Sequence, residues 1–299
     1  MFTRRRLALS ALALAAAVAL APPAMAKDTA FTSDRIGVSV TGSGPDVVLI
    51  PGLSSSPEVW EGTVKALPGY RYHLVHVAGF AGKPSGANAA GPVLPSVADE
   101  IARYIKEAGL KRPALVGHSM GGAWAMMVAA RHPGSASRVM VVDMLPFLGA
   151  MFGPPGSTPA TIEPMAAQMR DAMAKSPPEE RRKRIEETIA TMVKTEALRP
   201  GPIRHSLDSD LAVASRAFYE LVITDLRPEL PKIGVPMTVL FVRPPGAPVT
   251  NEQMELFYKL SFANAPQTVI KRIPDSYHFI MFDRPELFRD ELSAFLKGK

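Results

Sequence analysis

Residues 114–132 read ALVGHSMGGAWAMMVAARH, an apolar strand-like run followed by a short turn and a helical pattern. The turn places Ser119 in the arrangement G-x-S-x-G, which is meaningful only when a strand precedes it and a helix follows it. A nucleophile on so tight a turn needs neighbours without side chains, which Gly117 and Gly121 supply, while Gly122 relieves the packing of helix on strand. We therefore predict that Ser119 lies on a sharp strand-to-helix turn with its hydroxyl lifted clear of the sheet.

Short apolar strands alternate with helical patterns on either side of this turn. Strands are expected at 36–40, 47–50, 73–77, 114–117, 138–142, 236–242 and 267–273, and helices around 57–67, 96–109 and 120–132. The first two strands, joined by the turn cluster TGSGPD at 41–46, are expected to form a hairpin. This alternation predicts an α/β fold with a mostly parallel sheet covered by helices on both faces.

Residues 145–230 break the alternation of strands and helices, because they contain methionine-rich helical patterns and no strand-like run. We predict that they form a helical cap inserted into a domain spanning residues 27–299. The cap residues Phe147, Met151 and Phe152 either line an apolar pocket or form the cap's own core, and methionine suits both roles.

Three segments together resemble the α/β-hydrolase superfamily, from about residue 36 to the C-terminus. VVLIPGLSSSPEVW at 47–60 resembles the family's strand, oxyanion loop and Trp segment, with Pro51 where His commonly stands before the Gly. LVGHSMGGAWAMMVAARHP at 115–133 resembles the nucleophile turn and its helix. IPDSYHFIMFDRPELFRDELSAFL at 273–296 resembles the region of the catalytic histidine and the last helix. The resemblance implies an α/β-hydrolase fold with serine esterase- or lipase-like chemistry and no cofactor.

Two backbone N–H groups are the expected donors to an oxyanion. The helix that starts after the serine aims the Met120 N–H at the place where negative charge would develop. By its position in the resemblance, Leu53 supplies the second donor, because Gly52 lets the chain turn away from its strand.

A serine hydroxyl is a poor nucleophile at neutral pH and needs a positioned base. Of the six histidines, only His278 falls in a loop after the last strand and before the last helix, where the resemblance places the catalytic histidine. His118, in the turn itself, is expected to pack or hydrogen-bond beside the nucleophile without acting in catalysis.

The acid is where the sequence departs from the family pattern. The usual loop after MTVLFV reads RPPGAPVTNEQ and contains no Asp; Glu252 is the nearest acid, but it falls at a helix start where Thr250 is a suitable cap. Asp143 ends the buried strand 138–142, a position that some family members use, and it keeps the chain order Ser, Asp, His. We therefore predict the catalytic set Ser119, His278 and Asp143, with Glu252 as the alternative acid. Asp275 and Asp283 are interpreted as loop caps or surface acids.

The first 26 residues have the composition of a secretory signal peptide. Arg4 to Arg6 precede a short apolar stretch, and Ala24-Met25-Ala26 provides an A-x-A cleavage site. We predict cleavage after Ala26 and a periplasmic or secreted protein without a stable membrane anchor; an uncleaved N-terminal anchor is the alternative. The segment TRRRLAL also loosely resembles a twin-arginine signal.

Composition excludes several classes of function. Removing residues 1–26 takes away three arginines and no acids, so the formal net charge falls from +6 to +3. The sequence contains no basic stripe with interleaved aromatic residues, so it does not predict nucleic-acid binding. Cysteine is absent, which excludes disulfides and cysteine-ligated metals. His and Asp residues do not occur at metal-ligand spacing, so a site for another metal is not expected. The run RRKR at 181–184 is interpreted as a solvated helix face.

Together these features predict an exported, cofactor-independent serine hydrolase that acts on a small or medium apolar carboxylic ester. Amidase, lactonase and thioesterase chemistry use the same site parts, so the fold cannot separate them. The alternative from another class is a non-catalytic ligand-binding protein on the same scaffold. The oligomeric state is not predicted.

Overall fold

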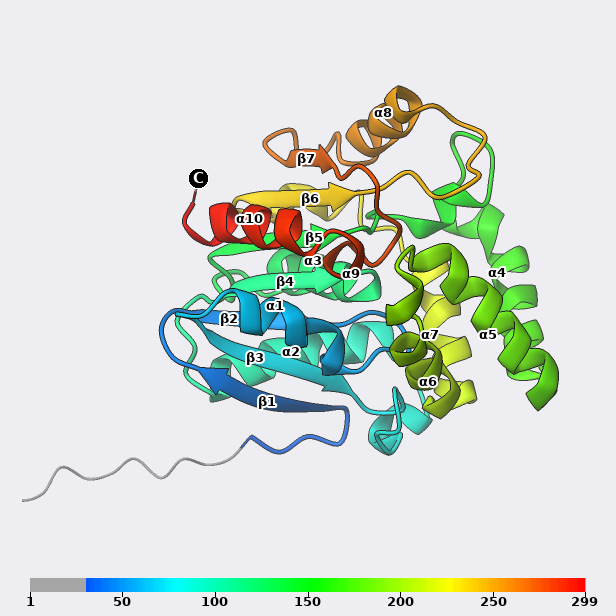
Figure 1. Cartoon of the computed structure of the whole chain (residues 1–299), viewed down its shortest axis with the longest axis horizontal. Coiled ribbons are helices and arrows are strands. Elements are labelled where there is room, and N and C mark those ends of the chain that lie inside the picture. Colours follow the sequence, from blue (N-terminus) through cyan, green and yellow to red (C-terminus); the bar gives the residue numbers. More distant parts are fainter. Residues whose placement is uncertain (1–30, 299) are drawn as a thin grey trace, which may run out of the picture. The chain divides into compact units, whose positions relative to one another are not determined.

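Seven strands form one sheet in the computed structural model, which describes residues 31–298 (Figure 1). Their order across the sheet is β1-β3-β2-β4-β5-β6-β7, and every neighbouring pair except β1 with β3 is parallel. The strands are β1 (Ile36–Gly42), β2 (Asp46–Ile50), β3 (Arg71–Val77), β4 (Ala114–His118), β5 (Arg138–Val142), β6 (Met237–Phe241) and β7 (Val269–Arg272). The predicted signal peptide at residues 1–26 lies outside the described residues.

The expected hairpin between the first two strands is wrong. β1 pairs antiparallel with β3, from Ile36 opposite Val77 to Gly42 opposite Arg71, and does not pair with β2. β2 is an almost fully buried run that takes parallel partners on both of its edges, β3 and β4. β1 is mostly exposed and therefore lies at the outer edge, where only one partner is needed.

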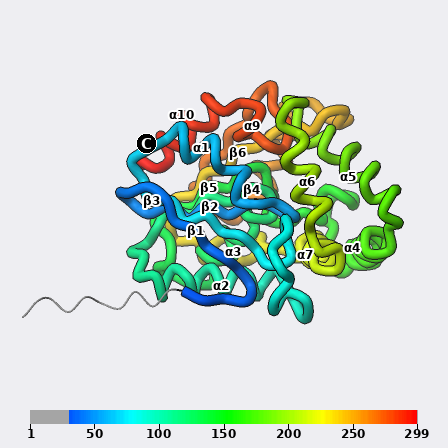
Figure 2. The backbone as a smooth tube through the Cα atoms, turned by 60° about the horizontal axis from the view of Figure 1, so that its bottom comes forward, coloured from blue at the N-terminus to red at the C-terminus, as the bar shows by residue number. Residues whose placement is uncertain are grey.

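Helices cover both faces of the sheet, as the strand–helix alternation predicts. On one face lie α2 (Leu94–Glu107) and α3 (Met120–Arg131), and on the other lie α1 (Glu61–Ala66), α9 (Ile280–Asp283) and α10 (Pro285–Leu296) (Figure 2). The helix α8 (Asn251–Ser261) packs into the same core as α2 and α3. The alternation of side chains along β2 shows the two layers: Val48 and Ile50 pack into one core, Val47 and Leu49 into the other.

Four longer helices fill the segment between β5 and β6. They are α4 (Pro159–Ala174), α5 (Pro178–Met192), α6 (Pro200–Asp208) and α7 (Leu211–Ile223), and they lie beyond the carboxyl ends of the parallel strands (Figure 1). Short 3-10 turns complete the fold at Pro57–Trp60, Gly86–Ala89, Leu148–Met151, Glu196–Leu198 and Leu230–Lys232. The four helices α4 to α7 therefore form a cap over the edge of the sheet where α/β proteins bind ligands.

The cap has a small core of its own. Phe147, Ile162, Ala166 and Val222 are buried together where α4 packs along α7. Among residues 31–298, no helix is long and apolar enough to cross a membrane.

Candidate active site

Ser119 occupies a strained turn between β4 and α3. Its φ of 53° and ψ of −127° lie in a region that residues with side chains rarely adopt. Two backbone hydrogen bonds hold this conformation: Ser119 N–H donates to Val142 O at 2.8 Å, and Gly122 N–H donates to Ser119 O at 2.7 Å. The neighbouring strand and the new helix therefore fix the serine in place.

The glycines around the serine are required by close backbone approach. A Cβ on Gly117 would overlap the Gly121 carbonyl, and a Cβ on Gly121 would overlap the carbonyl oxygen of Ile50. A Cβ on Gly52 would lie 2.9 Å from the Cβ of Ser119. The loop after β2 therefore runs directly against the serine, as the expected oxyanion loop requires.

His278 and Asp143 are joined by a short hydrogen bond. Nδ1 of His278 lies 2.6 Å from Oδ2 of Asp143, and the two side chains are 19% and 9% exposed. The other carboxylate oxygen accepts from the Val242 N–H at 3.1 Å and from the Tyr258 hydroxyl at 3.1 Å. This largely buried carboxylate thus has three hydrogen-bond partners, which offset the cost of its burial.

Asp143 itself sits in a constrained backbone position. It follows β5 with φ at 54°, and its N–H donates to Leu240 O at 2.7 Å, so the carboxylate turns toward the loop that carries His278. The alternative acid, Glu252, instead lies exposed in the first turn of α8, where Thr250 is the N-cap as expected. The structure therefore brings Asp143, not Glu252, to the histidine.

His118 lies behind the catalytic candidates. Its ring is buried, its Nε2 lies 3.1 Å from His278 O, and the two imidazole centroids are 4.6 Å apart. Burial lowers the pKa of His118 well below its ordinary value, so the ring is neutral at physiological pH. A neutral His118 supports the His278 backbone without adding a second charge to the site.

The backbone N–H groups of the two expected oxyanion donors are unpaired within the described residues. The N–H groups of Leu53 and Met120 have no acceptor within residues 31–298. Met120 begins α3, so its N–H is one of the groups that a helix start leaves unpaired. Leu53 lines the cavity that also contains Ser119, whereas Met120 is buried at the start of α3, and the two N–H groups remain the predicted oxyanion donors.

No hydrogen bond joins Ser119 to His278 in the part of the chain that the structure describes, although both side chains line one cavity. Such bonds are often long in unliganded sites and tighten with substrate bound. The structure thus brings Ser119, His278 and Asp143 to one site, in which the hydrogen bond between His278 and Asp143 is formed.

The remaining acids have structural roles. Asp283 accepts hydrogen bonds from the N–H groups of Lys194, Thr195 and Tyr277, and Asp275 is exposed beside Arg284. Asp283 therefore caps loop N–H groups, one of the two roles expected for it, and in doing so ties the histidine loop to the cap. Within residues 31–298, no three His, Asp or Glu side chains are grouped to hold a metal ion.

A cavity of ≈ 860 Å³ opens between the site and the cap. Ser119 and His278 lie at its floor, and its cap-facing walls are largely apolar, with Met151, Phe152, Met169, Met173 and Phe218 among them. Phe147 belongs instead to the cap core, so the methionine-rich segment serves both purposes considered above. The cavity is large enough for a medium-sized apolar ligand.

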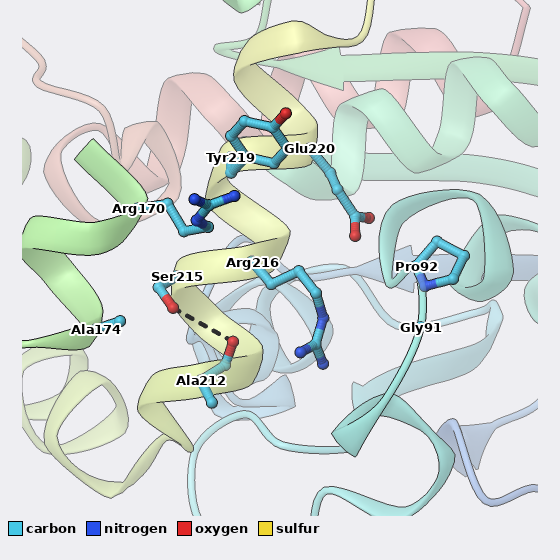
Figure 3. Close-up of a pocket in the computed structure, with 9 residues that line it drawn as sticks. All are labelled: Gly91, Pro92, Arg170, Ala174, Ala212, Ser215, Arg216, Tyr219 and Glu220. Carbon is cyan, nitrogen blue, oxygen red and sulfur yellow. Dashed lines mark hydrogen bonds between the residues drawn. The ribbon is translucent and has the colours of Figure 1, made fainter. Parts of the chain in front are cut away.

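A second, shallower pocket lies on another face of α4 and α7 (Figure 3). Its polar groups are largely engaged: Glu220 accepts from the Val93 and Leu94 N–H groups, and Arg216 donates to Asn88 O. It contains none of the predicted site residues, so the first cavity is the candidate active site.

Comparison with known proteins gives the same family as the fold. A sequence model described as the alpha/beta hydrolase family matches residues 47–291. The chain belongs to this family. A pimeloyl-(acyl-carrier protein) methyl ester esterase of Aeromonas hydrophila is 35% identical over 131 residues, 42% of this chain and 48% of that one, so the match spans about half of that esterase.

Two further relatives cover more of this α/β hydrolase. An sn-1-specific diacylglycerol lipase of Mus musculus is 26% identical over 84% of this chain and 81% of its own. The esterase structure from Exiguobacterium antarcticum superposes with a TM-score of 0.73 at 22% identity, covering 88% of this chain and 95% of that one, which shows a shared fold. Esterase and lipase relatives support hydrolase activity.

Proposed function

We propose that this α/β hydrolase is an exported serine hydrolase that cleaves small or medium apolar carboxylic esters. The observation that carries the proposal is the 2.6 Å hydrogen bond between His278 and Asp143 beside a serine held at φ 53°. The largely apolar walls of the cavity support an apolar substrate.

In the proposed reaction, Ser119 Oγ attacks the ester carbonyl while His278 Nε2 takes its proton. Asp143 holds the Nδ1–H, which keeps the ring in the tautomer whose Nε2 is a free base. The Leu53 and Met120 N–H groups receive the oxyanion. His278 then returns the proton to the departing alcohol, and water releases the acyl group by the same steps.

The second candidate is a binding protein that has kept the scaffold without turnover. The observation in its favour is that the Ser119–His278 hydrogen bond is not formed within the described residues. In that case the cavity would hold an apolar ligand that is not cleaved.

Hydrolysis of nitrophenyl esters of graded acyl length separates the two candidates. We expect turnover by the mature protein starting at Lys27, greatest for short and medium chains, and loss of turnover in Ser119→Ala. A folded wild-type protein that binds these esters without cleaving them would favour the binding protein. The size of the mature chain recovered from the periplasm tests export separately.

A further inference from the structure

The basic run at 181–184 divides into two pairs with different surroundings. Arg182 and Lys183 are exposed and face Glu186 and Glu187 across one helical turn of α5, each pair at 3.9 Å. This is the solvated face expected from the sequence. Arg181 and Arg184, in contrast, line the candidate active-site cavity.

Arg181 is used to hold the cap together. Its Nη2 donates to the carbonyl oxygens of Ser206, Leu207 and Ser209, at the end of α6. These acceptors fix α5 against α6 through Nη2, while Nε of Arg181 is buried without a hydrogen-bond partner among residues 31–298.

Arg184 has a different set of neighbours. Its Nη1 donates to Ser176 Oγ at 2.9 Å, and Ser176 also lines the cavity. Within residues 31–298 no carboxylate lies within 4 Å of Arg184, and Asp143, the single acidic residue in the cavity lining, is engaged by His278. A guanidinium oriented by a serine thus borders a largely apolar cavity without an anionic partner.

We infer that Arg184 is a specificity-determining residue that binds a carboxylate at the end of the substrate remote from the scissile ester. The cavity has the reacting groups at its floor, apolar walls, and this cation on the exposed side of the cap. Planar guanidinium donors match a carboxylate in two-point geometry, which a neutral chain end cannot use. The inference rests on the proposed ester hydrolysis, and the preferred substrate is an apolar chain with an ester at one end and a carboxylate at the other.

The test compares charged and neutral esters of equal length by pH-stat titration. One series uses methyl monoesters of linear dicarboxylic acids, with the carboxylate on the acyl side. A second uses acyl esters of ω-hydroxy acids, with the carboxylate on the alcohol side. The readout is the ratio of kcat/KM for each charged ester to that of its uncharged counterpart. This ratio does not depend on the fraction of active enzyme in each preparation.

In at least one series we expect a wild-type ratio of about twofold to fivefold, since Arg184 is exposed and an exposed charge pair contributes at most about fivefold. Arg184→Gln lowers that ratio to about one, and Arg184→Lys, which keeps the charge but not the two-point geometry, gives an intermediate ratio. Arg182→Gln, on the same helix but outside the cavity, stays within twofold of wild type. Raising the salt concentration lowers the wild-type ratio.

Equal ratios in wild type and Arg184→Gln would overturn the inference, and so would an equal fall in Arg182→Gln, which would show only a general surface-charge effect. Turnover of neutral esters with no preference for charged ones overturns the inference and leaves the proposed function standing. A folded protein that hydrolyses neither kind overturns the proposed function and the inference with it.

Discussion

Replacing Asp143 by Asn changes one group of the proposed relay while keeping its shape. The amide oxygen of Asn can still accept from the Val242 N–H and the Tyr258 hydroxyl, which lie 3.1 Å from the present Oδ1. The amide nitrogen then faces His278 Nδ1 across the present 2.6 Å contact, and it is a donor. The imidazole must accept there, so its proton moves to Nε2, and the ring can no longer take a proton from Ser119.

Loss of the working tautomer lowers kcat about 10⁴-fold in serine–histidine–aspartate sites. At 1.36 kcal/mol per tenfold, this corresponds to about 5.5 kcal/mol of lost transition-state stabilisation. We expect kcat/KM of Asp143→Asn on nitrophenyl butyrate to fall about 10³- to 10⁴-fold, with the folded structure retained by circular dichroism.

The matched control is Glu252→Gln, which alters the other candidate acid at an exposed position in the first turn of α8. We expect its kcat/KM within twofold of wild type. A loss of less than tenfold in well-folded Asp143→Asn, or an equal loss in Glu252→Gln, would refute the assignment of Asp143.

Three further perturbations follow from the geometry. Tyr258→Phe removes one of the hydrogen bonds to Asp143, and because one such bond contributes about 0.5–1.5 kcal/mol, we expect kcat/KM to fall about threefold to tenfold; no change would show that the carboxylate does not need this donor. Gly52→Ala puts a Cβ 2.9 Å from that of Ser119, so the oxyanion loop must shift and kcat/KM should fall at least about tenfold, whereas wild-type kinetics would contradict the close approach. Burial lowers the pKa of His73 below its ordinary 6.5. Below pH 6.5 the unfolded chain therefore binds a proton at this histidine that the folded chain excludes. The free energy of unfolding is highest above pH 6.5 and decreases as the pH falls below it. The Tm should therefore drop between pH 7.5 and pH 5.5, and it should drop less in His73→Gln than in the wild type. An equal drop in the two proteins would argue against this role of His73.

Much of the fold could be predicted because local patterns coincide with global constraints. The strand–turn–helix around Ser119 is encoded within a few residues, since its glycines are required by contacts with the immediately adjacent backbone. The buried runs of β2, β4 and β5 also read directly as central parallel strands.

The failed hairpin shows what local patterns leave out. The turn between β1 and β2 is short enough for a hairpin, but strand pairing is decided by which strand can leave one edge unpaired. The exposed residues of β1 place it beside β3 at the outer edge, and that choice depends on a strand about thirty residues further along the chain.

The site was predictable where it follows strand ends, and less so where the cap contributes. Asp143 and His278 meet because parallel strands end at one edge of the sheet. In the run RRKR, Arg182 and Lys183 pair with glutamates of α5, whereas Arg181 and the exposed Arg184 line the cavity. That difference depends on how α5 packs on α6, which the charge pattern alone does not reveal.

The central claim is that Ser119 is an activated nucleophile, and active-site labelling tests it most directly. Intact-mass measurement after treatment with a fluorophosphonate should show one adduct on the wild-type protein, none on Ser119→Ala, and much slower labelling of Asp143→Asn. A well-folded wild-type protein without an adduct, or an adduct that persists in Ser119→Ala, would contradict the account.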